Sequence, residues 1–122
     1  MLMTSEYMEW IRKSEKDLEA AKYNLTGGLL EEGAFFLQQS AEKSLKALFI
    51  KKTGKFPRIH DLVSLAKDIK APEEIITSAR ILSPAYHYTR YPDVVKVENL
   101  KERINELKES SEKILKWVKK NL

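Results

Sequence analysis

Apolar residues recur at three- and four-residue steps along most of the chain, which is the spacing of one face of an α-helix. Residues 5–26 show this pattern, and the face contains Trp10, Ile11, Leu18, Ala21 and Leu25. Gly27 and Gly28 follow, and glycine readily adopts the left-handed conformation that ends many helices. The sequence therefore predicts an amphipathic helix over residues 5–26 and a reversal of the chain directly after it. Residues 29–33 then form either the turn or the first residues of the next helix.

Residues 33–52 carry the widest apolar stripe, formed by Phe35, Phe36, Leu37, Ala41, Leu45, Leu48 and Phe49. Polar residues interrupt it, namely Gln38, Gln39, Glu42, Lys43 and Lys46. We expect this segment to form the central helix and to end at Thr53 and Gly54. Residues 55–60 contain Pro57, which cannot donate a backbone hydrogen bond, so they are predicted to form a loop.

Two shorter helices and one long helix are predicted in the remaining chain. Asp61 can cap a helix over residues 62–69, and Pro72, Glu73 and Glu74 suit the first turn of a helix that ends near Leu82. Residues 83–93 contain two prolines and no clear period, so they form either a kinked helix end or a structured loop. Residues 97–118 again show helical spacing and predict a closing helix.

No segment alternates between apolar and polar residues as a strand would, and the connections are short. These features predict a single all-α domain over residues 1–122, folded as an up-and-down antiparallel bundle of four to five helices. No uncharged run approaches the ~20 residues that a membrane span needs, and the first residues do not resemble a signal peptide. We therefore expect a cytoplasmic protein with no membrane association.

Composition restricts the chemistry that is available. The 122 residues are 33% charged with a net charge of +4, a mild excess that favours an anionic partner. There is no cysteine, and the two histidines fall in no recognised ligand spacing, so we predict no metal and no cofactor. None of the four glycines opens a strand-to-helix turn, which argues against a phosphate-binding loop for ATP.

One short segment concentrates the remaining chemical groups. Residues 80–91 hold three of the five tyrosines, two of the five arginines and one of the two histidines. Arg80 and Arg90 offer planar forks for phosphate, Tyr86, Tyr88 and Tyr91 offer stacking faces, and His87 exchanges a proton near neutral pH. The alternative is structural: the tyrosines pack at the end of the bundle, and Asp93 caps the last helix or pairs with Arg90.

Two further features bear on catalysis and binding. Arg80 and His87 are seven residues apart, so an unbroken helix would present both on nearly one face, although Pro84 lies between them. That pair could cleave RNA without a metal, with His87 as the base and Arg80 stabilising the phosphate charge. His60 lies just before the N-terminus of a predicted helix, a position that favours anions, so it is a candidate for ligand binding. The alternative is that its side chain is buried against a neighbouring helix.

Three blocks occur in an order typical of a known family. They are Phe36-Leu37-Gln38-Gln39-Ser40-Ala41-Glu42-Lys43-Ser44-Leu45-Lys46-Ala47-Leu48, His60-Asp61-Leu62, and Tyr86-His87-Tyr88-Thr89-Arg90-Tyr91-Pro92-Asp93. Together they resemble the HEPN domain family of prokaryotes over essentially the whole chain. The resemblance implies a helical homodimer that works with a small nucleotidyltransferase and binds a nucleotide or RNA.

The resemblance also assigns candidate site residues. Many HEPN proteins are similar to the ribonuclease toxins of toxin-antitoxin pairs, which use an arginine and a histidine separated by four to six residues, here Arg80 and His87. Their arginine is usually followed by a polar residue, whereas this chain has Ile81, so we favour binding over catalysis. The binding hypothesis assigns the ligand to His60, Tyr86, Arg90, Tyr91 and Asp93. A metal-independent endoribonuclease and a plain dimeric interaction module remain the alternatives.

Overall fold

Six helices make up the described part of the chain, and no strand occurs there. The computed structural model describes residues 2–89 and 99–122, with only the backbone described for residues 2–5, 87 and 88. The helices are α1 (Leu2–Thr26), α2 (Leu30–Thr53), α3 (Leu62–Asp68), α4 (Glu73–Leu82), α5 (Ala85–Tyr88) and α6 (Leu100–Lys120). The all-α prediction is confirmed, and each predicted helix is present.

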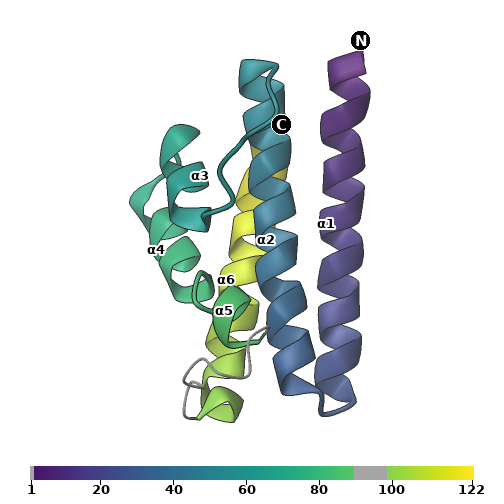
Figure 1. The fold of residues 1–122 in the computed structure, drawn as a ribbon, viewed down its shortest axis with the longest axis vertical. Coiled ribbons are helices and arrows are strands. Elements are labelled where there is room, and N and C mark those ends of the chain that lie inside the picture. Colours follow the sequence, from purple (N-terminus) through teal and green to yellow (C-terminus); the bar gives the residue numbers. More distant parts are fainter. Residues whose placement is uncertain (1, 90–98) are drawn as a thin grey trace.

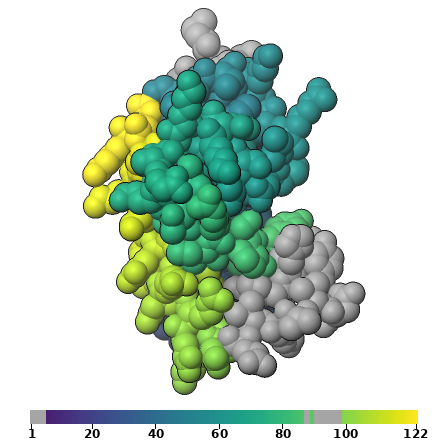
Figure 2. Space-filling view, turned by 90° about the vertical axis from the view of Figure 1, so that its left-hand side faces the viewer, coloured from purple at the N-terminus to yellow at the C-terminus, as the bar shows by residue number. Residues whose placement is uncertain are grey.

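The long helices form an up-and-down bundle around α2. In Figure 1, α1 runs downward, α2 upward, α4 downward and α6 upward, so that helices consecutive in this order are antiparallel. The short helices α3 and α4 together fill the third position of the bundle, and α6 packs against both α2 and α4. Figure 2 shows the face that α3 and α4 cover, with α6 along its side.

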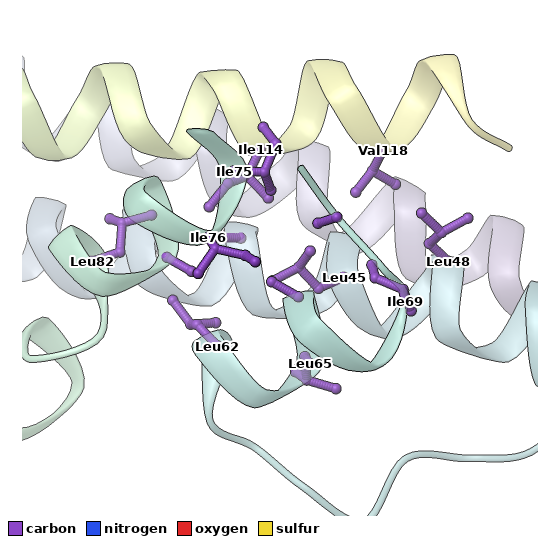
Figure 3. Close-up of a cluster of buried hydrophobic side chains, with 14 of the residues drawn as sticks. Leu45, Leu48, Leu62, Leu65, Ile69, Ile75, Ile76, Leu82, Ile114 and Val118 are labelled. Atoms are coloured by element: carbon purple, nitrogen blue, oxygen red, sulfur yellow. The ribbon is translucent and has the colours of Figure 1, made fainter. Parts of the chain in front are cut away.

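The core includes buried residues of α1, α2, α3, α4 and α6, and Figure 3 shows the part between α2, α3, α4 and α6. Ile75 of α4 lies beside Ile114 of α6, while Leu82 lies on the side away from Val118, as expected for antiparallel helices. Ile75, Leu82, Ile114 and Val118 are all fully buried. Burying one such side chain contributes about 1.5–3 kcal/mol, which makes this interior the main source of stability.

Glycine residues end the first two helices, as the sequence predicts. Gly28 has φ 81° and Gly54 has φ 71°, both in the left-handed region. Gly54 also donates its backbone N–H to the carbonyl of Ile50 at 2.8 Å. Helix α2 begins at Leu30, so residues 30–33 are the first residues of the helix rather than a turn, and Gly33 lies inside it.

Gly33 permits the close approach of α1 to α2. A Cβ at this position would lie 2.4 Å from Cδ2 of Leu25 and 3.4 Å from the carbonyl oxygen of Ala21. The absence of a side chain at Gly33 therefore lets the two helices meet near their connection.

Pro84 separates α4 from α5. Helix α4 ends at Leu82, Ser83 and Pro84 form a turn, and α5 is a single turn of four residues. Proline has no N–H and its ring clashes with the preceding turn, which explains the break. Arg80 and His87 are therefore not on one unbroken helix.

No helix in the described ranges is both long and apolar enough to cross a bilayer.

Candidate functional site

Two adjoining pockets form a continuous polar groove across α1, α2, the loop before α3, and α5. One, of about 250 Å³, is lined by Gln38, Glu42, His60, Asp61, Ser83 and Tyr86. The other, of about 280 Å³, is lined by Trp10, Gln39, Glu42, Lys43, Lys46, His60 and Tyr86. Glu42, His60 and Tyr86 belong to both, and we call the combined cavity the polar groove.

The floor of the polar groove is a polar stripe on α2. Gln38, Glu42 and Lys46 are spaced by four residues, which places them on one face of the helix. All three are buried, with exposed fractions of 2%, 8% and 4%. Lys46 Nζ donates to Oε2 of Glu42 at 2.7 Å, and Gln38 Nε2 donates to Oε1 at 3.2 Å. A buried charge is tolerated here because each one has a partner.

These residues are functional candidates that the sequence analysis missed. Gln38, Glu42 and Lys46 were interpreted as interruptions of an apolar stripe and as part of a block that resembles the family, and none of them was assigned to ligand binding. The available signal was their regular spacing on a helix with apolar residues on both flanks, since polar residues on a solvated face need not align in this way. The tertiary structure places them beneath His60 and Tyr86 rather than in solvent.

His60 lies directly above the Glu42 and Lys46 pair. Lys46 Nζ lies 2.8 Å from Nδ1 of His60, and Glu42 Oε2 lies 3.4 Å from the same nitrogen. An ammonium group only donates, so in the contact with Lys46 the ring nitrogen Nδ1 is the acceptor. The imidazole is 70% exposed, so the alternative of a buried histidine is wrong.

Asp61 fixes the loop that carries His60. It is the N-cap of α3, as predicted, and its Oδ2 accepts from the backbone N–H of Ser64 at 2.9 Å. The hydroxyl of Ser83 donates to the other carboxylate oxygen at 3.3 Å, which links this loop to the turn before α5. The bond from the Ser64 backbone N–H holds the pKa of Asp61 below its ordinary value, against the opposing effect of burial.

Aromatic residues form one end of the polar groove. Lys46 Nζ lies 5.6 Å from the centre of the Trp10 ring, a cation–π contact. Phe56, from the loop before α3, packs edge-on against Trp10 with ring centres 5.3 Å apart. Phe56 is 58% exposed and Arg58 is exposed, so this loop presents an aromatic ring and a cation to solvent beside the groove.

The structure brings together two of the predicted site residues. His60 and Tyr86 are 26 positions apart in the chain and line the same groove. Arg80 lies elsewhere: it is exposed on α4 and lines neither pocket, and its Nη1 lies 3.4 Å from a carboxylate oxygen of Glu73. The backbone of His87 is in α5, but its side chain lies outside the described residues, as do Arg90, Tyr91 and Asp93.

Within the part of the chain that the structure describes, no three histidine, aspartate or glutamate side chains lie close enough together to hold a metal ion. Glu42 and Asp61, the carboxylates nearest His60, are both engaged, with Lys46 and with the α3 N-terminus respectively. The arrangement is suited instead to hydrogen bonding, because it combines an imidazole, a carboxylate, amides and aromatic rings in one groove.

The fold is that of a known class of helical protein. The HEPN domain model matches residues 7–121, so the chain belongs to the HEPN domain family. Among solved structures it is similar to TT1696 from Thermus thermophilus, with 26% identity, a TM-score of 0.85 and coverage of 95% of this chain and 98% of that chain. It is also similar to ST0689, described as an archaeal HEPN homologue, with 32% identity, a TM-score of 0.78 and coverage of 94% and 96%. Comparison with curated protein sequences gave no match.

Proposed function

We propose that this HEPN protein is a dimeric module that binds a nucleotide or an RNA phosphate beside residues 80–93. The observation that carries the proposal is the convergence of His60 and Tyr86 on one groove. Both residues were assigned to ligand binding from their sequence blocks, which are far apart in the chain. Their meeting in a cavity with polar and aromatic walls has the character of a ligand site.

The residues around the groove supply what a nucleotide requires. Tyr86 offers a stacking surface, and His60 offers an N–H donor. Exposed Arg58 lies two residues before His60, and Arg90, Tyr91 and Asp93 follow Tyr86 by four, five and seven residues. In this proposal the arginines bind phosphate through their planar forks, while the groove contributes the remaining contacts.

The homodimer and the nucleotidyltransferase partner are part of the same proposal. Half-buried aromatic residues at the bundle surface, among them Phe35 and Trp117, offer apolar area for an interface. Light scattering of the purified protein tests the dimer, and an observed monomer would remove it. Co-expression with a nucleotidyltransferase encoded next to this gene tests the partner, through co-purification as a stable complex.

The central experiment is calorimetric titration with ATP and, separately, with a short single-stranded RNA, both in EDTA. We expect saturable binding that falls at least about tenfold in Arg90→Ala, the loss of one charge-assisted phosphate contact. The matched control is Arg103→Ala, because Arg103 is exposed on α6 and pairs only with Glu106 among the described residues. Unchanged affinity in Arg90→Ala, or no binding to either ligand, would contradict the proposal.

The same samples test the ribonuclease alternative. RNA integrity is checked on a denaturing gel after the titration. Cleavage that resists EDTA and is lost in both Arg80→Ala and His87→Ala would make the protein a metal-independent endoribonuclease. Binding without cleavage supports the binding module.

A further inference from the structure

The loop between α2 and α3 lies in a basic stretch of the chain. Residues 43–60 contain no acidic residue and hold the cations Lys43, Lys46, Lys51, Lys52, Lys55 and Arg58. The first four are engaged within the fold, two by carboxylates, one by a backbone carbonyl and one by a tyrosine ring. Lys55 and Arg58 lie in the loop and are exposed, and their side chains have no partner among the described residues. These two cations can therefore bind an anion without breaking an existing contact.

An exposed aromatic ring lies between these two cations in the chain. Phe56 is 58% exposed, although burial of a phenyl ring ordinarily stabilises a fold. The rings of Phe56 and Trp10 meet at an interplanar angle of 63° with their centres 5.3 Å apart. An edge-to-face contact of this kind covers only part of the phenyl ring, and the exposed remainder is free to stack on a flat ligand group.

The fold holds this loop in place at three points. Pro57 is buried, and its ring fixes one backbone dihedral angle beside Phe56. The hydroxyl of Thr53 accepts from the backbone N–H of Lys55 at 3.1 Å, and the N-cap at Asp61 fixes the other end. In Figure 1 the loop descends from the upper end of α2 across that helix to α3. Because the loop is already ordered, little conformational entropy is lost when a ligand binds.

Trp10 connects the loop to the polar groove, because it contacts Phe56 and also lines the groove. The exposed ring and the groove are therefore contiguous. A single base cannot occupy both of them. A strand of RNA offers what this arrangement requires, namely successive bases with flat faces, joined by phosphates that each carry a negative charge.

We propose that residues 55–58 form a stacking platform for single-stranded RNA, in which a base packs on Phe56 while Lys55 and Arg58 bind neighbouring phosphates. This rests on the proposed function and specifies the ligand as RNA rather than a mononucleotide. Bases in a duplex are stacked on one another and leave no face for the phenyl ring, so the platform selects single strands. It tolerates different sequences, because every base has a flat face.

The ring is tested by fluorescence anisotropy of a labelled short single-stranded RNA in EDTA. Phe56→Leu keeps an apolar side chain against Trp10 but removes the ring, so it should weaken binding at least about fivefold, the loss expected for one stacked base. Phe56→Tyr keeps a ring and should bind as the wild type does. Tyr23→Leu is the control, because Tyr23 is 82% exposed near the other end of α1 and should not matter.

The preference for single strands is tested with the duplex that the same RNA forms with its complement. The duplex should bind at least about fivefold more weakly than the single strand, and Phe56→Leu should leave its affinity unchanged. A duplex that binds as tightly as the single strand overturns the stacking assignment.

The two cations are tested by the dependence of RNA affinity on salt. Each phosphate contact to a single strand contributes about 0.7 to the slope of log affinity against log salt concentration. Lys55→Gln combined with Arg58→Gln should therefore reduce the slope by about 1.4. Lys113→Gln combined with Lys116→Gln removes the same charge from exposed positions of α6 and should leave the slope unchanged. Equal reductions in both double variants would show a general effect of charge and overturn the assignment.

The outcomes separate this inference from the proposed function. RNA binding that is equal in the wild type and Phe56→Leu overturns the inference while the proposed function stands, and so does binding of ATP without binding of RNA. If neither ATP nor RNA binds, both are wrong. Light scattering identifies a different occupant: if Phe56→Leu converts a dimer to a monomer and leaves RNA affinity unchanged, the ring packs against a second copy of the chain and the inference is wrong.

Discussion

Ser14 of α1 and Ser40 of α2 exchange hydrogen bonds across the helix pair. The Ser14 hydroxyl donates to the backbone carbonyl of Ser40 at 2.6 Å, and the Ser40 hydroxyl donates to the carbonyl of Ser14 at 2.8 Å. Both residues are fully buried, and their small side chains let the helix backbones come within hydrogen-bonding distance. This reciprocal pair fixes the register of α1 against α2, and hence the position of Trp10 at the end of the polar groove.

Removing either hydroxyl is expected to lower the free energy of unfolding. Ser14→Ala and Ser40→Ala should each cost about 1 kcal/mol, because each loses a buried hydrogen bond to a carbonyl. Urea denaturation of both single variants and the double variant measures the costs and their coupling. Thr26→Ala is the control, since its hydroxyl bonds within its own exposed helix end and should change stability by less than about 0.5 kcal/mol. If the three alanine variants lost the same free energy of unfolding, the hydrogen bonds between Ser14 and Ser40 would not contribute specifically to stability.

Because the ion pair of Glu42 and Lys46 is buried, removing one partner should cost more stability than replacing both partners with apolar residues. Lys46→Met should destabilise the protein by about 3 kcal/mol, because it leaves the carboxylate of Glu42 buried without its cation. Adding Glu42→Leu removes the stranded charge, and the double variant should regain at least half of the loss.

A surface pair provides the comparison. Lys119 of α6 pairs with Glu15 of α1, and both side chains are more than 40% exposed. Lys119→Met should therefore cost no more than about 1 kcal/mol in the same urea experiment. A Lys46→Met variant as stable as Lys119→Met would mean that the Glu42 and Lys46 pair is solvated in solution.

The N-cap at Asp61 predicts a dependence of stability on pH. The Ser64 backbone N–H, aided by the hydroxyls of Ser64 and Ser83, holds the pKa of Asp61 below its ordinary value of 3.8. A lowered folded-state pKa means that Asp61 contributes stability above about pH 4, which is lost as the pH falls through the folded value.

Asp61→Ser separates the charge of the cap from its geometry. Serine can still accept from the Ser64 backbone N–H but does not titrate. At pH 7 we expect the variant to be less stable by about 0.3–1 kcal/mol, because it loses the negative charge at the N-terminus of α3. The difference from wild type should shrink toward about pH 3, as measured by urea denaturation across this range. A difference that grows with acidification would reverse the sign of the assigned pKa shift.

Lys70 is strained in a way that glycine would relieve. It has φ 58° at the end of α3, where Ala71 donates its backbone N–H to the carbonyl of Ala66 at 2.9 Å. The left-handed conformation costs a residue with a Cβ about 1 kcal/mol. Lys70→Gly should therefore raise the midpoint of thermal unfolding, with a gain of about 0.5–1 kcal/mol. Lys67→Gly, inside α3, should instead lower the midpoint, with a loss of stability of about 0.5–1 kcal/mol.

Much of the fold was predictable because its signals are local. The three- and four-residue spacing of apolar side chains located every long helix, and Gly28 and Gly54 marked two of the helix ends. The start of α2 was left open, because residues 29–33 could form either the turn or the first residues of the helix; the structure begins α2 at Leu30 and so includes Gly33. Its role is to admit Leu25, a contact between helices that no local pattern specifies.

Two of the residues that line the polar groove were selected from the sequence. His60 and Tyr86 were selected for their chemistry, and the fold brings them together. Arg80 was also selected, but the break at Pro84 ends the helix that would have aligned it with His87. The polar stripe of Gln38, Glu42 and Lys46 was not recognised, because charged residues on a helix are far more often solvated than buried.

The sequence by itself determined the helices, the all-α fold class and the blocks that resemble the HEPN family, because apolar periodicity, capping residues and turn residues act over a few positions. Only the tertiary structure decided which polar residues meet. Lys46 and His60 are 14 positions apart, and their contact depends on how the loop before α3 folds back over α2. Burial and hydrogen bonding between distant segments depend on packing, which local sequence patterns do not specify. Packing is therefore what places Glu42 and Lys46 in the lining of the polar groove.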